Sequence, residues 1–238
     1  LVNCVAYQDG RKLAEIEKNE ISDYLSRPGC FVWVALRDAS ETELEEMREE
    51  FDLHSLAVED ARHGHQRPKI EEYGDSLFVV LHTIEVEGDE LRAGEVHVFA
   101  GRNYVLTVRH GTERGFQDVR ARAEREPELL QHGSGYVLYA LMDAIVDRYF
   151  PVLDAVEMEV EKLEGQLFTP GASPRENIEA LYYVKQKLTT MKHATSPLQE
   201  NVSKLYGGRV PGVCAGLGEY FRDVYDHLVR INQSIDAA

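Results

Sequence analysis

The sequence predicts a mixed α/β fold, in which a partly antiparallel sheet with flanking helices is followed by long antiparallel helices. Residues 31–37 form an apolar, β-prone run, and a helix-capping motif begins at Ser40. Four β-prone segments between residues 70 and 109 are separated by very short connections, which normally join antiparallel strands. From residue 134 onward, nearly every residue can be placed on a helix. A sheet domain followed by a helical region is therefore expected.

Residues 1–133 are predicted to form the α/β domain. Apolar periodicity marks its elements, and glycine, proline and aspartate mark the breaks between them. The expected elements are strand 2–8, helix 18–26, strand 31–37, helix 40–51, helix 54–60, strands 70–73, 77–86, 91–100 and 103–109, and helix 112–126. The strand at 31–37 is apolar up to Arg37, which is typical of a central strand buried on both faces. In the helix at 54–60, Leu56 is expected to point into the core.

Residues 134–238 are predicted to form three helices. The first, at residues 136–168, should kink near Asp147, because Pro151 removes one hydrogen bond of the helix. After a turn at residues 169–172, Ser173 begins the second helix, which has a proline in its first position.

The third helix carries a seven-residue apolar repeat. Its members are Leu217, Phe221, Val224, Leu228, Ile231 and Ile235. So narrow a repeat is typical of a helix that packs on another helix. The α/β domain and copies of the same chain are the two candidates to cover it, and the repeat favours copies. No glycine, proline or basic cluster closes the helix after Ile235, so we expect the helix to continue past residue 238.

The composition is strongly acidic. The chain has 42 aspartate and glutamate residues against 26 lysine and arginine residues, for a formal net charge of −16. This charge argues against a nucleic-acid partner or an anionic lipid surface, and it favours cations or a basic partner. The three cysteines are scattered without metal-site spacing, which favours a reducing compartment such as the cytosol. No apolar run approaches the roughly 18 residues that a membrane helix needs.

Carboxylates form three groups that could hold a metal ion. They are Glu59 with Asp60, Asp143 with Asp147, and Asp223 with Asp226. If the groups converge, a site with only oxygen ligands suits a hard cation such as Mg²⁺ or Ca²⁺. A divalent ion between chains would also offset the repulsion between acidic subunits. A solvated helix face is the alternative explanation for each group taken singly.

Two other kinds of site have weaker support. His63 and His65, beside Glu59 and Asp60, suggest an alternative zinc or iron site, but no other histidine has a recognisable spacing with them. The sequence has no glycine-rich phosphate loop, no G-x-S-x-G elbow and no H-E-x-x-H motif. It therefore predicts that the protein is not an enzyme, and a metal-dependent hydrolase would depend on the two histidines alone.

Three stretches of the sequence resemble the cytoplasmic part of the CorA divalent-metal transporters. They are LHSLAVEDARHGHQRPKIEEY at 53–73, YVLYALMDAIVDRYF at 136–150 and YFRDVYDHLVRI at 220–231. The resemblance implies a homopentamer in the cell inner membrane, with these α/β domains on the cytoplasmic side. The last helix would be the start of a pore-lining stalk that reaches the membrane through C-terminal helices beyond residue 238, where the family's Gly-Met-Asn selectivity loop is also expected.

The resemblance also implies regulatory Mg²⁺ ions between neighbouring subunits, which keep the pore closed. The matching carboxylates are Glu59 and Asp60 in the VED triplet, Asp143 in MDA and Asp223 in FRDV. Co²⁺ and Zn²⁺ are the alternative ions.

Two other functions compete with this interpretation. The related ZntB zinc transporters share the same plan, although residues 65–69 and the carboxylate set favour the Mg²⁺/Co²⁺ branch. A soluble adaptor that binds a partner helix through the apolar repeat is a different class of protein. For the chain itself, we expect a monomer or weak oligomer without divalent ions, because removal of the stalk and the high negative charge both oppose association.

Overall fold

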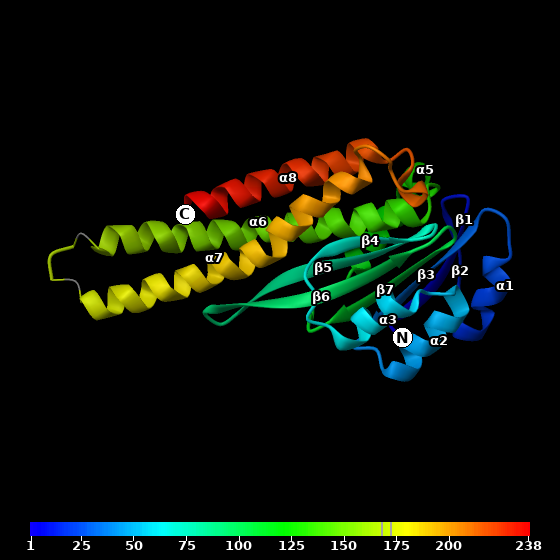
Figure 1. Ribbon diagram of the computed structural model, residues 1–238, viewed down its shortest axis with the longest axis horizontal. Coiled ribbons are helices and arrows are strands. Elements are labelled where there is room, and N and C mark those ends of the chain that lie inside the picture. Colours follow the sequence, from blue (N-terminus) through cyan, green and yellow to red (C-terminus); the bar gives the residue numbers. More distant parts are fainter. Residues whose placement is uncertain (168, 172) are drawn as a thin grey trace.

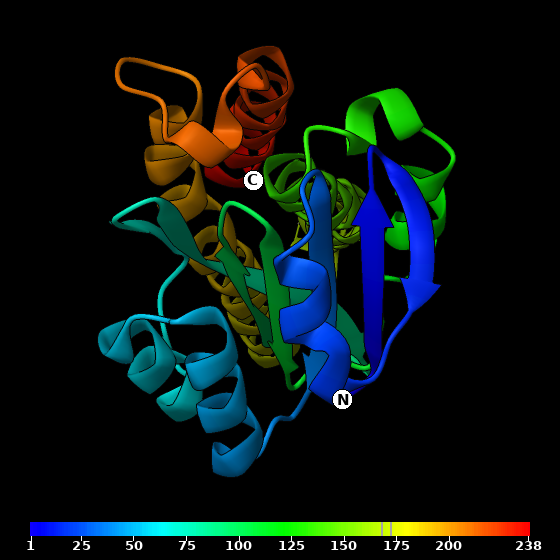
Figure 2. The same ribbon diagram turned by 90° about the vertical axis from the view of Figure 1, so that its right-hand side faces the viewer.

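A mixed sheet forms the middle layer of the structure, a computed structural model that describes residues 1–167, 169–171 and 173–238 (Figures 1 and 2). Within those residues the sheet has seven strands in the order β2-β1-β3-β7-β6-β5-β4. The strands are β1 Asn3–Gln8, β2 Arg11–Glu15, β3 Cys30–Arg37, β4 Lys69–Tyr73, β5 Ser76–Glu87, β6 Glu90–Ala100 and β7 Tyr104–His110. β3 and β7 run parallel, and the other neighbouring strands pair antiparallel. The predicted fold class is confirmed.

One face of the sheet is covered by the short helices of the first third of the chain. They are α1 Ile21–Leu25, α2 Glu41–Phe51 and α3 Ser55–His63, and a single 3-10 turn, Lys18–Glu20, precedes α1. Leu44 and Met47 of α2 join Ala57 and Val58 of α3 in the hydrophobic cluster on this face. The capping box at Ser40 is confirmed, because the Ser40 side chain accepts a hydrogen bond from the Glu43 backbone N–H and the Glu43 carboxylate accepts one from the Ser40 backbone N–H.

The opposite face carries the long helices. The elements are α4 Gln117–Glu124, α5 Pro127–Leu130, α6 Ser134–Leu167, α7 Pro174–Val202 and α8 Gly218–Ala237, with 3-10 turns at Ser203–Leu205 and Gly212–Cys214. α6 and α7 extend beyond the sheet as an antiparallel pair (Figure 1). α6 is continuous through Pro151, and the predicted Ser173 cap begins α7. One hydrophobic cluster joins these helices to the sheet, and the predicted division of the chain at residues 133/134 stays a prediction.

The apolar repeat of α8 is buried inside its own chain. Leu217, Phe221, Val224, Leu228 and Ile231 are each 0% exposed, and they pack in the same cluster as α6 and α7. Figure 1 shows α8 lying along both helices. The expectation that copies of the chain cover this repeat is wrong, and so is the adaptor that would bind a partner helix through it. A narrow apolar stripe predicts that a helix will cover it, but not which helix.

A polar contact fixes the register of α7 and α8. Asn232 of α8 accepts a hydrogen bond from the Thr195 hydroxyl at 2.7 Å and donates one to the Gln199 side chain at 2.6 Å. Thr195 is completely buried and Asn232 nearly so. Because a buried polar group is costly without a partner, sliding α8 along α7 would be unfavourable.

Several local predictions are corrected. Leu56 is 56% exposed, because the buried face of α3 is formed by Ala57, Val58 and Ala61. α3 also continues to His63, and the charged helix expected at 112–126 is limited to α4. The expected end of the first long helix at Phe168, and the expected turn residue Ala172, lie outside the described residues.

In the part of the chain that the structure describes, no helix combines the length and the hydropathy needed to cross a bilayer.

Candidate metal site

A group of metal-binding side chains lies where α8 crosses α6. Asp143 and Asp147 are one turn apart on α6, and His227 faces them from α8. One ligand atom from each of the three lies within 4.8 Å of the others. Among the described residues this is the group of histidine, cysteine and acidic side chains close enough to share an ion.

His227 also connects this group to the predicted residue Asp223. The His227 ring lies between two carboxylates, with Nδ1 3.9 Å from an Asp147 oxygen and Nε2 3.9 Å from an Asp223 oxygen. The His227 ring lies nearly perpendicular to the Phe150 ring, at 5.7 Å between centroids. Nδ1 of His227 is buried, and within the described residues it makes no hydrogen bond. A nitrogen atom that could bind a metal ion therefore lies beside the carboxylates of Asp143, Asp147 and Asp223.

The electrostatics of the site favour a cation. Burial raises the pKa of Asp143, and the nearby Asp147 raises it further, while Arg122 lowers it. Arg122 Nη1 lies 3.6 Å from the Asp143 carboxylate, but the Arg122 side chain is mostly exposed. Burial also raises the pKa of Tyr139 to about 12, with the charge of Asp143 as the second cause. An ion bound here would compete with a proton for the Asp143 carboxylate.

The other two predicted residues lie elsewhere in the chain. Glu59 and Asp60 are on α3, on the sheet face opposite α6 and α8 (Figures 1 and 2). Glu59 is exposed, and Asp60 accepts a hydrogen bond from Lys69 Nζ at 2.6 Å. The structure thus brings Asp143 and Asp223 together, and it does not bring Glu59 or Asp60 to them within one chain.

The alternative site at His63 and His65 gains no support. His63 Nδ1 is 3.0 Å from the Glu59 carbonyl oxygen, a contact within α3. His65 lies after the end of α3 with a positive φ of 56°. Among the described residues, neither histidine belongs to a group at metal-binding distance.

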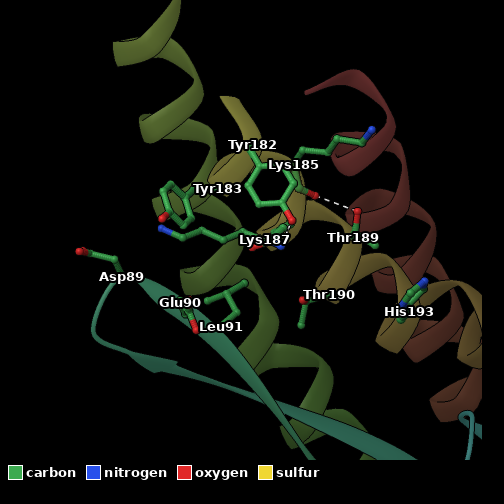
Figure 3. Close-up of a pocket in the computed structure, with 11 residues that line it drawn as sticks. Asp89, Glu90, Leu91, Tyr182, Tyr183, Lys185, Lys187, Thr189, Thr190 and His193 are labelled. Carbon is green, nitrogen blue, oxygen red and sulfur yellow. Dashed lines mark hydrogen bonds between the residues drawn. The ribbon is translucent and has the colours of Figure 1, made fainter. Parts of the chain in front are cut away.

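A pocket of about 500 Å³ between the β5–β6 turn and α7 offers no comparable site (Figure 3). Figure 3 shows Asp89 and His193 at its opposite ends. Its Lys187 already pairs with Glu159, at 2.7 Å. Lysine and tyrosine side chains, which are poor metal ligands, form much of the remaining wall.

Sequence reasoning named Asp147 only as the neighbour of Asp143, and it did not include His227 in the candidate site. The signal was the spacing, since Asp147 follows Asp143 by four residues and His227 follows Asp223 by four. Such spacing places each pair on one helix face. It does not show that the two faces meet.

Comparison with known proteins shows the family. The family model described as "CorA-like Mg2+ transporter protein" matches residues 29–238. The cobalt/magnesium transport protein CorA of Thermotoga maritima is 29% identical over 208 residues, which cover 86% of this chain and 59% of that protein. The putative metal ion transporter YfjQ of Bacillus subtilis is 27% identical, with 87% of this chain and 64% of that protein covered. The chain thus spans about three fifths of the length of these relatives.

Solved structures share the fold at low identity. The soluble domain of CorA from Methanocaldococcus jannaschii superposes with a TM-score of 0.75 at 18% identity, covering 100% of this chain and 92% of that one. The ZntB cytoplasmic domain from Vibrio parahaemolyticus has a TM-score of 0.68 at 12% identity, covering 89% and 88%. These two likenesses show the fold, whereas the match to the family model extends over most of the sequence. The chain belongs to the family of CorA-like Mg²⁺ transporter proteins.

Proposed function

We propose that this chain is the cytoplasmic, ion-sensing part of a Mg²⁺/Co²⁺ transporter of the cell inner membrane. In the assembled protein, five copies surround a pore, and α8 leads through further C-terminal helices into the membrane. Bound Mg²⁺ holds neighbouring subunits in the closed arrangement. The observation that carries the proposal is the group of Asp143, Asp147 and His227, with Asp223 beside it, at the crossing of α6 and α8.

The physical basis of sensing is differential affinity. A cation that binds one arrangement of the subunits better than another shifts the population toward that arrangement. At −16 per copy, subunits repel each other, so an ion at their boundary stabilises the packed arrangement more than the separated one. Removal of the ion restores the repulsion and favours opening.

Glu59 and Asp60 complete the proposed site from a neighbouring copy. Both lie on α3, and the Glu59 side chain is exposed. Asp60 forms an ion pair with Lys69, which places one positive charge beside the two carboxylates of α3. Mg²⁺ sheds its water reluctantly, so water-mediated contacts to these carboxylates are expected alongside few direct ones.

The identity of the ion is a separate question, because His227 adds a nitrogen donor. Imidazole suits Co²⁺ and Zn²⁺ better than Mg²⁺, which prefers oxygen. This one residue is compatible with Co²⁺ and also supports a second candidate function, zinc transport of the ZntB kind. Family membership favours Mg²⁺/Co²⁺ transport.

Transport by the full-length protein tests the proposal. We expect Asp60→Ala and Asp223→Ala to weaken the inhibition of transport by cytosolic Mg²⁺, because each removes a carboxylate of the boundary site. Asp226→Ala is the matched control, since Asp226 is an exposed carboxylate on the same helix outside the group. Unchanged Mg²⁺ inhibition in both variants would refute the sensing role.

Uptake of Mg²⁺, Co²⁺ and Zn²⁺ by the same protein decides between the two ions. Mg²⁺ or Co²⁺ uptake that exceeds Zn²⁺ uptake supports the proposal. Uptake of Zn²⁺ alone would refute Mg²⁺/Co²⁺ transport and support zinc transport of the ZntB kind.

A further inference from the structure

A small cavity of about 100 Å³ lies between α4 and the sheet, and its lining residues do not include those of the metal site. Its wall includes Trp33 of β3, Thr107 and Arg109 of β7, and Phe116 and Arg120 beside and on α4. Trp33 and Val119 of α4 belong to the hydrophobic cluster on this sheet face. The cavity is thus an arginine-containing space within a largely apolar layer.

Two buried nitrogen donors of residues that line this cavity have no acceptor among the residues that the structure describes. Nε1 of Trp33 is buried and makes no hydrogen bond, and the same holds for Nη1 of Arg120. Trp33 as a whole is 2% exposed. The Arg120 guanidinium lies over the indole, 4.4 Å from the ring centroid. Because buried donors nearly always have a partner, an acceptor is expected beside these two nitrogens, which the cavity next to them could admit after a small side-chain shift.

The arginines of this cavity also lack direct ion-pair partners. In the described part of the chain, no carboxylate oxygen lies within 4 Å of a nitrogen of Arg109 or Arg120. Arg109 donates to the Glu113 carbonyl instead, at 3.1 Å. Glu124, one turn after Arg120, accepts a hydrogen bond from the Tyr7 hydroxyl at 2.8 Å. Two unpaired arginines are unexpected in a chain with 42 acidic and 26 basic residues.

Burial adds to the need for an anion. It lowers the pKa of Arg120 from the ordinary 12.5, and the nearby acidic groups Tyr7 and Glu124 offset this only in part. The guanidinium nevertheless stays protonated at neutral pH. A bound anion would supply the missing charge and hydrogen-bond acceptors together.

The position in the sheet suits a ligand. β3 and β7 are parallel neighbours, and the cavity lies toward their carboxyl ends, at Ala35, Thr107 and Arg109. After β3 the chain continues to α2 on one face, and after β7 it continues to α4 on the other. Connections that leave toward opposite faces open a crevice at the ends of the strands, where α/β sheets commonly bind ligands.

We propose that this cavity binds a small oxyanion, held by the Arg120 guanidinium and the Trp33 indole N–H, with Arg109 adding positive charge. A cavity of about 100 Å³ exceeds the roughly 10–15 Å³ that a single water molecule needs. We therefore expect a small anion such as inorganic phosphate or a short carboxylate. The proposal is independent of the metal site and of transport.

Trp33 makes the test direct, because it is the only tryptophan in the 238-residue sequence. Sodium phosphate and sodium acetate are titrated separately into the chain at constant ionic strength, and the tryptophan emission is recorded. We expect a saturable change with at least one of the two, and the tighter ligand identifies phosphate or carboxylate as the source. Arg120→Gln should weaken that binding about 10- to 100-fold, since a buried, charge-assisted donor is lost.

Arg125→Gln is the matched control. Arg125 follows α4 directly, and its Nε donates to the Ala121 carbonyl rather than into the cavity. This variant should bind the anion as the original chain does. Isothermal titration calorimetry on Trp33→Phe, which keeps an aromatic ring but removes the donor, should show weaker binding without depending on fluorescence or on the folding of the Arg120 variant.

Three results would overturn the proposal. The first is the lack of a saturable response to either oxyanion, which would mean that water alone fills the cavity. The second is equal binding by the original chain and both cavity variants. The third is an equally tight response to sodium chloride, which would show a site that selects charge and not oxygen acceptors.

Discussion

Replacing Asp143 by asparagine distinguishes the effect of this buried carboxylate on the stability of the metal-free chain from its proposed role in metal binding. Burial raises the pKa of Asp143, and Asp147 raises it further. The folded chain therefore holds the proton more tightly than the unfolded chain, whose aspartate has an ordinary pKa of 3.8. As the pH rises from that value through the folded-state pKa, the free energy of unfolding falls, and the loss is complete at higher pH. Asparagine cannot ionise and avoids this loss.

The metal-free Asp143→Asn variant should thus be at least as stable as the original chain at neutral pH. The variant also loses the ion pair with Arg122, but the Arg122 side chain is 57% exposed, and such pairs contribute only about 0–1 kcal/mol. For the original chain, a divalent ion at about 100 times its Kd adds about 2.7 kcal/mol. For a chain of this length, that corresponds to a Tm increase of roughly 5–10 °C, most of which the variant should lose.

Thermal unfolding followed by circular dichroism, with EDTA, MgCl₂ or CoCl₂, measures both effects. Asp226→Asn is the control, because it removes an exposed carboxylate of α8 outside the metal-binding group. It should keep the metal-dependent increase in Tm. A variant Asp143→Asn that is clearly less stable in EDTA, or that keeps the full increase with metal, would refute the reasoning.

Two further predictions concern packing, and urea denaturation measures both. Gly135→Ala should destabilise the chain by about 1–3 kcal/mol, because the added Cβ would collide with the Val213 carbonyl. Its control is Gly165→Ala on the same helix, where the added Cβ meets open space and should stabilise the chain by about 0.5–1 kcal/mol. Equal effects of the two substitutions would contradict the close approach at Gly135. Leu228→Ala should lower the free energy of unfolding by about 2–5 kcal/mol at every protein concentration, because the helices that cover Leu228 belong to the same chain. Tyr182→Ala is the control: the Tyr182 side chain is exposed, so its loss should change the free energy of unfolding by less than about 0.5 kcal/mol. If the destabilisation by Leu228→Ala depended on protein concentration, a helix from another copy of the chain would have to cover the apolar repeat.

Sequence patterns predicted the parts of the fold that are dictated by burial. β3 lies between two other strands and between two helical layers, so its residues are almost uniformly apolar. β2 was not predicted, because it is an edge strand whose residues are largely exposed and polar. Leu56 was misplaced because the helix begins at Ser55, and the helix turns this side chain toward solvent.

The site was predictable one helix at a time. Asp143 and Asp223 followed from motifs, and the spacing of four residues marked Asp147 and His227 as their neighbours. The height at which α8 crosses α6 is set by packing along their whole length, including the contact of Tyr139 with Phe221. Periodicity within one helix carries no information on that height.

The orientation of α8 has a consequence for any assembly of several copies. Its hydrocarbon face is buried within the chain, so the face left outward carries Glu219, Arg222, Asp223, Asp226 and Arg230, all exposed. Contacts between such charged faces are screened within about 8 Å at physiological ionic strength. Neighbouring α8 helices could therefore separate and reassociate without exposing apolar surface to water. The free energy of that separation would depend on the ionic strength.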